Sequence, residues 1–153
     1  MVMLKWWFIF SASMIGFGTS AAFGLVEKLW TIDQTKISFG IIALYFIVSG
    51  WIGWLTRKVE KTHYSDIIRE VEKHLNGLEE ASDLCMRLAI IGTTLGFAIM
   101  VGAAFGSGVI ITPAAIAGLA SGLSLIYLVT AVGVLCSSLL NLQIVGLRFL
   151  CDK

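Results

Sequence analysis

Residues 88–147 read LAIIGTTLGFAIMVGAAFGSGVIITPAAIAGLASGLSLIYLVTAVGVLCSSLLNLQIVGL. This run of about sixty residues contains no Asp, Glu, Lys, Arg or His. A helix needs about 20 apolar residues to cross the hydrocarbon core of a bilayer, so the run is long enough for two crossings. Gly106, Gly108 and Pro113 mark a turn between them, because proline suits the first turn of a helix. The run therefore predicts a helical hairpin that spans a membrane.

The composition of the whole chain supports the same class. Of its 153 residues, 58% are hydrophobic and only 14% are charged. That composition leaves too little polar surface to cover a soluble domain of this size. The formal net charge of +1 gives no reason to expect binding to nucleic acid. A polytopic membrane protein is the class that fits.

Two further spans are predicted before the charge-free run. Residues 6–26 and 37–56 are uncharged, and each is about one bilayer thickness long as a helix. The third span runs from about residue 88 to 105 and the fourth begins near residue 113. The predicted fold is an all-α integral membrane protein with four transmembrane helices. A cleaved signal peptide is a competing account of the first segment, but we expect this segment to remain as a span.

The basic residues predict the orientation. With the amino terminus in the cytoplasm, nine of the 11 Lys and Arg side chains lie inside, and only Lys28 and Lys36 lie outside. This distribution satisfies the positive-inside rule. We therefore expect both termini in the cytoplasm.

The chain divides into three predicted regions. Residues 1–56 hold the first two spans, which we expect to form an outer pair that faces the lipid. Residues 57–87 form a short helical cytoplasmic segment, in which Asn76-Gly77 predicts a helix stop. Glu79 and Glu80 favour a new helix start that continues into the third span. Residues 88–153 hold the last two spans. The fourth helix would be about 55 Å long, whereas the hydrocarbon core is about 30 Å thick. We therefore expect the last two helices to extend into the cytoplasm.

Small residues predict where the last two helices pack. Glycines spaced four residues apart allow two helix backbones to approach closely where lipid offers no hydrophobic drive. The predicted helix-packing positions are Gly92, Gly96, Gly118, Gly122 and Gly133. We expect the third and fourth helices to form an inner layer that the first two surround.

Polar side chains on the last two helices form the candidate functional site. Serine and threonine hydroxyls can donate and accept hydrogen bonds, so a ring of them could hold water or relay a hydrated ion. The competing interpretation is that these hydroxyls bond to carbonyls of their own helix and only hold helices together. The candidate pore-lining residues are Thr93, Thr130, Thr94, Tyr127, Ser137 and Asn141.

Two segments resemble the MotA/TolQ/ExbB family of proton channels. Gly92-Thr93-Thr94-Leu95-Gly96 matches the family's Gly-Thr-x-x-Gly segment, and Val129-Thr130-Ala131-Val132-Gly133 matches its Ala/Val-Thr-Ala-x-Gly segment. The resemblance covers roughly residues 84–143. It implies that the two threonines line a central pore in a ring of five copies. It also implies a one-span partner similar to MotB, TolR or ExbD, whose membrane aspartate carries the proton, and a location in the bacterial cytoplasmic (inner) membrane.

The sequence differs from the family pattern in two ways that bear on which machine the chain would serve. Leu125 stands where ExbB and TolQ carry a glutamate, as in the MotA branch. The cytoplasmic segment is much shorter than the domain by which MotA engages the flagellar rotor, so a minimal stator for another machine is as well supported as a flagellar one. Because no ionisable side chain lies within a predicted span, this chain would form the stationary wall of the channel and its partner would supply the acid.

We therefore predict a stator subunit of a membrane motor that is driven by protons or sodium ions, without a cofactor. A self-assembling, holin-like pore and a structural subunit of a membrane complex are the alternatives. An enzyme is not expected, because the chain shows no catalytic constellation. His63, His74 and Cys85 are eleven residues apart, too far along one helix to share a metal ion.

Overall fold

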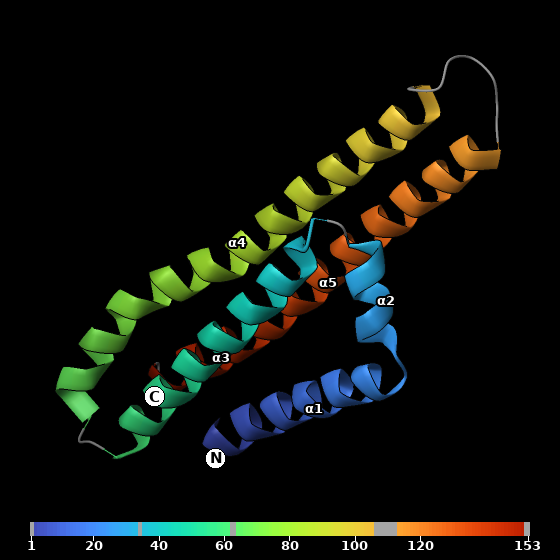
Figure 1. The fold of residues 1–153 in the computed structure, drawn as a ribbon. Helices are drawn as coiled ribbons and strands as arrows, with labels where there is room; N and C mark the ends of the chain where they lie inside the picture. The colour runs from blue at the N-terminus through green and yellow to red at the C-terminus, as the bar shows by residue number, and fades with distance from the viewer. Residues whose placement is uncertain (1, 34, 62–63, 106–112, 152–153) are drawn as a thin grey trace.

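A computed structural model describes residues 2–33, 35–61, 64–105 and 113–151, and the regular structure in these ranges is helical. α4 and α5 lie side by side as two long antiparallel helices, and α3 packs against both (Figure 1). α1 lies along α3, and α2 connects the two. The helices are α1 (Val2–Ala22), α2 (Leu25–Ile32), α3 (Ile37–Lys61), α4 (Tyr64–Phe105) and α5 (Pro113–Cys151).

Three of the described helices are long and apolar enough to cross a membrane: Ile37–Val59 in α3, Lys73–Gly102 in α4 and Ile116–Phe149 in α5. The expected all-helical class with several candidate spans is thus confirmed, by length and composition. α1, expected as the first span, is not among the three. The count of four spans and their orientation stay predictions.

One continuous seam joins α4 to α5. Its residues on α4 alternate in steps of four and three, a repeat of 3.5 that keeps one helix face against a partner as in a coiled coil. The seam continues from the charged half of α4 into its uncharged half. The buried seam residues of α4 are Val71, Leu75, Leu78, Ser82, Cys85, Ala89, Gly92 and Gly96. Those of α5 are Gly122, Leu125, Val129, Gly133, Cys136, Leu140, Ile144 and Leu147.

The predicted helix stop at Asn76-Gly77 and the new start at Glu79 are wrong, because α4 is one helix from Tyr64 to Phe105. Asn76 and Gly77 are exposed, whereas Leu75 and Leu78 on either side of them are buried in the seam. A glycine inside a helix costs about 1 kcal/mol relative to alanine. Burying one leucine contributes about 1.5–3 kcal/mol, so the packing of the two leucines outweighs the local signal.

Glycines allow the close approach of α4 and α5 in the uncharged half. A Cβ atom on Gly122 would lie 2.6 Å from the Cβ of Met100, and one on Gly96 would lie 2.9 Å from Cγ1 of Ile126. A Cβ atom on Gly133 would collide with the Cβ of Ala89 and lie 3.2 Å from the carbonyl oxygen of Cys85. Larger side chains at these positions would therefore push the helices apart.

α1 is attached to α3 by hydrogen bonds between mostly apolar surfaces. The indole N–H of Trp6 donates to the carbonyl oxygen of Ser49 at 3.1 Å, and its ring lies over Gly53. The hydroxyl of Tyr45 donates to that of Ser13 at 2.7 Å. These contacts place α1 and α3 together on one side of the α4–α5 pair.

α3 is offset along the pair toward the charged half of α4. A Cβ atom on Gly92 would lie 3.5 Å from Cγ2 of Ile37, at the start of α3. Further along, the ring of Trp51 lies 5.8 Å from that of His74. The last 13 residues of α4, about 20 Å of helix, therefore extend past the start of α3 (Figure 1).

The turn between α2 and α3 is organised by Asp33, which is fully buried. Its carboxylate accepts hydrogen bonds from the Thr35 hydroxyl at 2.6 Å and from the backbone N–H of Ser38 at 2.8 Å. Burial alone would raise the pKa of Asp33, but the hydrogen bonds from Thr35 and Ser38 bring it below its ordinary value. Lys36 lies at the end of this turn, and its φ of 55° is in the left-handed region.

Gly133→Ala should destabilise the fold by about 1–3 kcal/mol, because the added methyl group overpacks the seam against Ala89. Gly146→Ala on the same helix is the matched control, since a Cβ atom there meets nothing within 4 Å. Alanine is the better helix former, so the control should be unchanged or more stable. Thermal unfolding in detergent, followed by circular dichroism, measures both. Equal effects of the two substitutions would contradict the close approach at Gly133.

Asp33→Asn should lower the stability at pH 7 by about 1 kcal/mol, because a neutral acceptor makes weaker hydrogen bonds than a carboxylate. The pKa of Asp33 is lowered by folding, so its contribution is fully present above the unfolded pKa of about 3.9. It is lost as the pH falls through the lower, folded pKa. The stability difference between parent and variant should therefore close below pH 4 in unfolding experiments. A difference that is constant with pH would contradict the assignment.

Candidate pore-lining site

Thr93 and Thr130 lie on the same side of the α4–α5 pair. Leu88 and Val132 pack against the core that α3 covers. Thr93 follows Leu88 by five residues, and Thr130 precedes Val132 by two. Each threonine therefore points roughly 140–160° away from that hydrophobic residue around its helix axis. Both threonines are half-buried. They therefore flank the seam on the side of the pair that faces away from α3.

The hydroxyl protons of these threonines are used within their own helices. Thr93 donates to the carbonyl oxygen of Ile90 and Thr130 to that of Ile126, both at 2.7 Å. Thr94 donates to the carbonyl oxygen of Ile91 at 2.8 Å. The three hydroxyls therefore donate to carbonyl oxygens of their own helices, as the competing interpretation of the sequence expects. Each hydroxyl oxygen keeps a lone pair, so toward other groups it acts as a hydrogen-bond acceptor.

Ser137, one of the candidate pore-lining residues, does not lie on an open face of the pair. It is buried in the seam, where the Ser82 hydroxyl donates to its carbonyl oxygen at 3.1 Å and lies 3.1 Å from its hydroxyl. Ser137 therefore lies among the buried residues, while Asn141 is exposed.

Thr94 and Tyr127 face opposite outer sides of the pair. Each is two positions from a seam residue, Gly92 or Val129, and so points about 160–200° away from the partner helix. Thr94 is exposed and Tyr127 is 69% exposed. The structure thus brings Thr93 and Thr130 to one side and separates Thr94 from Tyr127. Among the predicted packing glycines, Gly118 is half-buried and the other four are buried in the seam.

Three polar features were not recognised in the sequence. Gln143 is buried on α5, and neither atom of its amide has a hydrogen-bond partner within the described ranges. Glu79 and Arg148 form an ion pair of 3.4 Å between α4 and α5. Ser82 supplies the buried hydroxyl opposite Ser137. The seven-residue spacing of the α4 seam residues and of Cys136 and Gln143 is the signal that could have found Ser82 and Gln143, but it does not relate Glu79 to Arg148.

No metal site is evident, since the described residues contain no group of three His, Cys, Asp or Glu side chains that could hold an ion. His63 lies outside the described residues. No protein-family model, curated protein or solved structure matches this chain. The resemblance to MotA, TolQ and ExbB therefore stays a prediction, and the geometry of the two threonines carries the functional argument.

Ser82→Ala should lower the stability by about 1–2 kcal/mol, because it removes a buried hydrogen bond and leaves the Ser137 hydroxyl without its neighbour. Ser138→Ala is the matched control, since Ser138 is exposed beside Ser137. We expect its effect to stay within about 0.5 kcal/mol. Unfolding in detergent by denaturant or heat compares the two. A Ser82→Ala variant as stable as the control would remove this pair from the seam.

Proposed function

We propose that this chain is the channel subunit of an ion-driven membrane machine, in which several copies enclose a path for protons or sodium ions. The observation that carries the proposal is the position of Thr93 and Thr130. They come from two helices, yet both face the side of the α4–α5 pair that lies opposite α3. A ring of copies that turns this side inward would bring the threonines of every copy toward one lumen. The resemblance to the MotA/TolQ/ExbB family supports a ring of five.

The hydroxyl geometry favours a stationary wall that solvates a passing charge. Because Thr93 and Thr130 donate to their own helices, they offer acceptor oxygens to the lumen. Acceptor oxygens suit a hydrated cation or the O–H of a protonated carboxylic acid. No Asp, Glu or His lies between residues 88 and 147. The acid that binds the proton would therefore come from a partner with one membrane helix, similar to MotB, TolR or ExbD.

The arrangement of the chain ends is compatible with the proposed orientation. The first residues of α1 and the last residues of α5 lie at the same end of the bundle (Figure 1). An even number of spans, with both termini in the bacterial cytoplasm, requires this. The membrane, the motor role and the identity of the partner are part of the same proposal.

Thr130→Val should reduce ion flux through the complex of this chain and its partner by about tenfold. It removes an acceptor to a charged group, worth about 1.5–3 kcal/mol. Ser124→Ala is the matched control, since Ser124 also donates to its own helix, to Ala120 at 2.8 Å, and lies roughly 120° from Thr130 around α5. Flux into liposomes measures both variants. Native mass spectrometry verifies that their assemblies match the parent.

Two outcomes would contradict the proposal. Unchanged flux in Thr130→Val with an intact assembly would remove Thr130 from the ion path. Equal conductance with and without a partner would favour the holin-like pore, which assembles from one kind of subunit.

A further inference from the structure

Two buried polar side chains, one on α3 and one on α5, have no hydrogen-bond partner among the described residues. Ser49 of α3 is 0% exposed and Gln143 of α5 is 3% exposed. The hydroxyl oxygen of Ser49 and both amide atoms of Gln143 are unpaired. Buried polar groups are nearly always hydrogen-bonded, either to protein or to ordered water. We therefore asked whether these three atoms lie close enough together to share a ligand.

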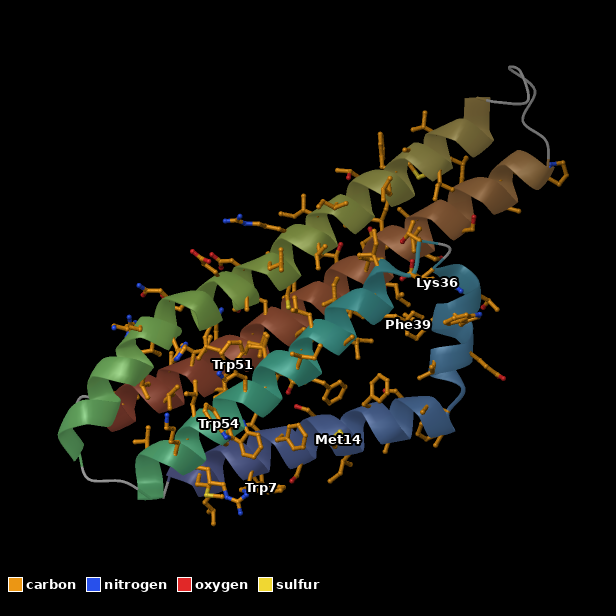
Figure 2. The ribbon with its side chains drawn as sticks, turned by 60° about the vertical axis from the view of Figure 1, so that its left-hand side comes forward. Trp7, Met14, Lys36, Phe39, Trp51 and Trp54 are labelled. Atoms are coloured by element: carbon orange, nitrogen blue, oxygen red, sulfur yellow. The ribbon has the colours of Figure 1, made fainter. Side chains whose placement is uncertain are left out.

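Ser49 and Gln143 lie at the same height in the bundle. A Cβ atom on Gly92 would meet both Ile37 of α3 and Val129 of α5, so these two residues mark one level. From there α3 and α5 run in the same direction, from the end at Lys36 toward the end at Trp54 (Figure 2). Ser49 follows Ile37 by about 18 Å of helix and Gln143 follows Val129 by about 21 Å, so their heights differ by only about 3 Å.

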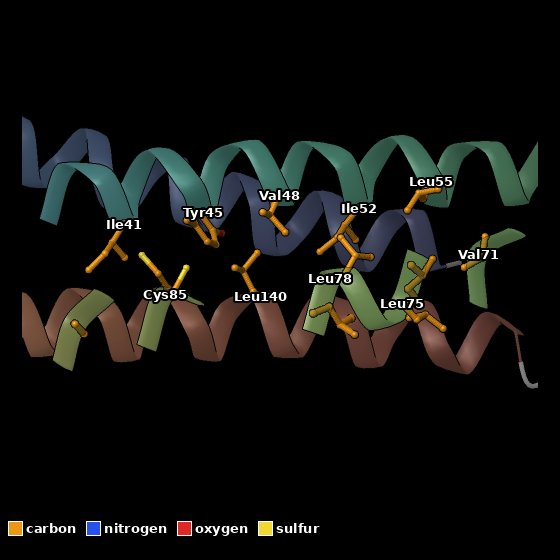
Figure 3. Close-up of a cluster of buried hydrophobic side chains, with 14 of the residues drawn as sticks. Ile41, Tyr45, Val48, Ile52, Leu55, Val71, Leu75, Leu78, Cys85 and Leu140 are labelled. Carbon is orange, nitrogen blue, oxygen red and sulfur yellow. The ribbon is translucent and has the colours of Figure 1, made fainter. Parts of the chain in front are cut away.

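The packing of the core gives the same height independently. Figure 3 shows Leu140 of α5 between Tyr45 and Val48 along α3. Gln143 follows Leu140 by about 4.5 Å of helix, and Ser49 directly follows Val48. Both side chains therefore lie just beyond the level of Leu140, on neighbouring helices.

Gln143 faces the side of α5 that α3 covers. It follows Val132 by 11 residues and Leu139 by four, which places it roughly 20° and 40° from them around the helix. Both of these hydrophobic residues pack against the core cluster that includes α3. The buried amide is therefore directed toward α3.

The Ser49 hydroxyl is directed away from its own helix. Thr56 of α3 and Ser13 of α1 each donate to the carbonyl oxygen four residues earlier, at 2.8 Å, whereas Ser49 makes no such bond within the described ranges. Ser49 follows Tyr45 by four residues, and the Tyr45 hydroxyl reaches Ser13 at 2.7 Å. The carbonyl oxygen of Ser49 accepts from the Trp6 indole of α1. Ser49 therefore belongs to the junction where α1, α3 and α5 meet.

The chemistry of the three atoms fits water. A glutamine amide carries its donor and its acceptor on different atoms, so one serine hydroxyl bonded directly to it would leave the other amide atom unpaired. A buried water molecule typically makes about three hydrogen bonds and can serve an amide and a hydroxyl together. A Cβ atom on Gly146, one turn beyond Gln143, would meet nothing within 4 Å, so the packing beside the amide is not tight.

We propose that Ser49 and Gln143 bind ordered water in the junction of α1, α3 and α5. Both residues lie in candidate membrane spans, where lipid offers no hydrogen bonds to a polar group. The bound water satisfies the three unpaired atoms and joins α3 to the α4–α5 pair by hydrogen bonds. This inference concerns the contact between α3 and α5, and it does not depend on the proposed channel.

NMR of the parent chain in detergent micelles tests the water site. The sequence contains two glutamines, Gln34 and Gln143, so isotope labelling of glutamine gives two side-chain amides, and Gln34→Glu leaves that of Gln143 alone. We expect the Gln143 amide protons to cross-relax with water, with NOE and ROE of opposite sign, which marks a bound water and not passing solvent.

Two serine variants exclude a signal that is relayed by a hydroxyl proton. In Ser49→Ala the signal should weaken but persist, because the amide still binds water after the hydroxyl is removed. Ser124→Ala is the matched control, since Ser124 is exposed and donates to its own helix, and it should leave the signal unchanged.

A Gln143 amide without water cross-relaxation in the parent chain would overturn the site. Complete loss of the signal in Ser49→Ala would also overturn it, because the two side chains would then be bonded directly and the signal relayed. If Ser49→Ala fails to fold, a crystal structure of the parent chain decides the same question. Water within hydrogen-bond distance of the Gln143 amide would support the site, and a direct bond to Ser49 without water would overturn it.

Discussion

The seam between α4 and α5 is the contact on which the remaining structure depends. Helices in lipid gain no hydrophobic free energy by associating, so they pack through van der Waals contacts between closely approaching backbones. Gly92, Gly96, Gly122 and Gly133 permit that approach in the uncharged half of the pair. In the other half α3 adds a third face, and larger side chains such as Leu78 and Leu140 fill the space between three helices (Figure 3).

The position of each polar side chain relative to the seam determines its environment. One residue along a helix turns the side chain by about 100°. Thr93 therefore flanks the seam, whereas the adjacent Thr94 lies on the back of α4, in line with Arg87. Ser137 is buried beside the seam, where its hydroxyl lies 3.1 Å from that of Ser82. The threonines that flank the seam therefore offer hydrogen-bond acceptors on one side of the α4–α5 pair, and the back of α4 carries charged side chains.

Helicity, the long hairpin and the small residues between its helices were predictable, because they follow from local periodicity and from the absence of charge. The stop at Asn76-Gly77 was wrong, since a local preference of about 1 kcal/mol cannot compete with two buried leucines. The α2 helix and the burial of Asp33 were missed, because the connection is short and its hydrogen bonds join residues that no periodic pattern relates. The grouping of Thr93 with Thr130 required knowing which side α3 covers.

The sequence by itself determined that the chain is helical and apolar, which segments are long enough to span a bilayer, and where α4 and α5 can touch. Each of these depends on residues within a few turns of one another. Only the tertiary structure decided that α3 lies beside the charged half of α4, with Ile41 next to Cys85. That offset arises from side-chain packing between residues more than forty positions apart. Many registers along an apolar helix are similar in composition, and shape complementarity alone selects among them.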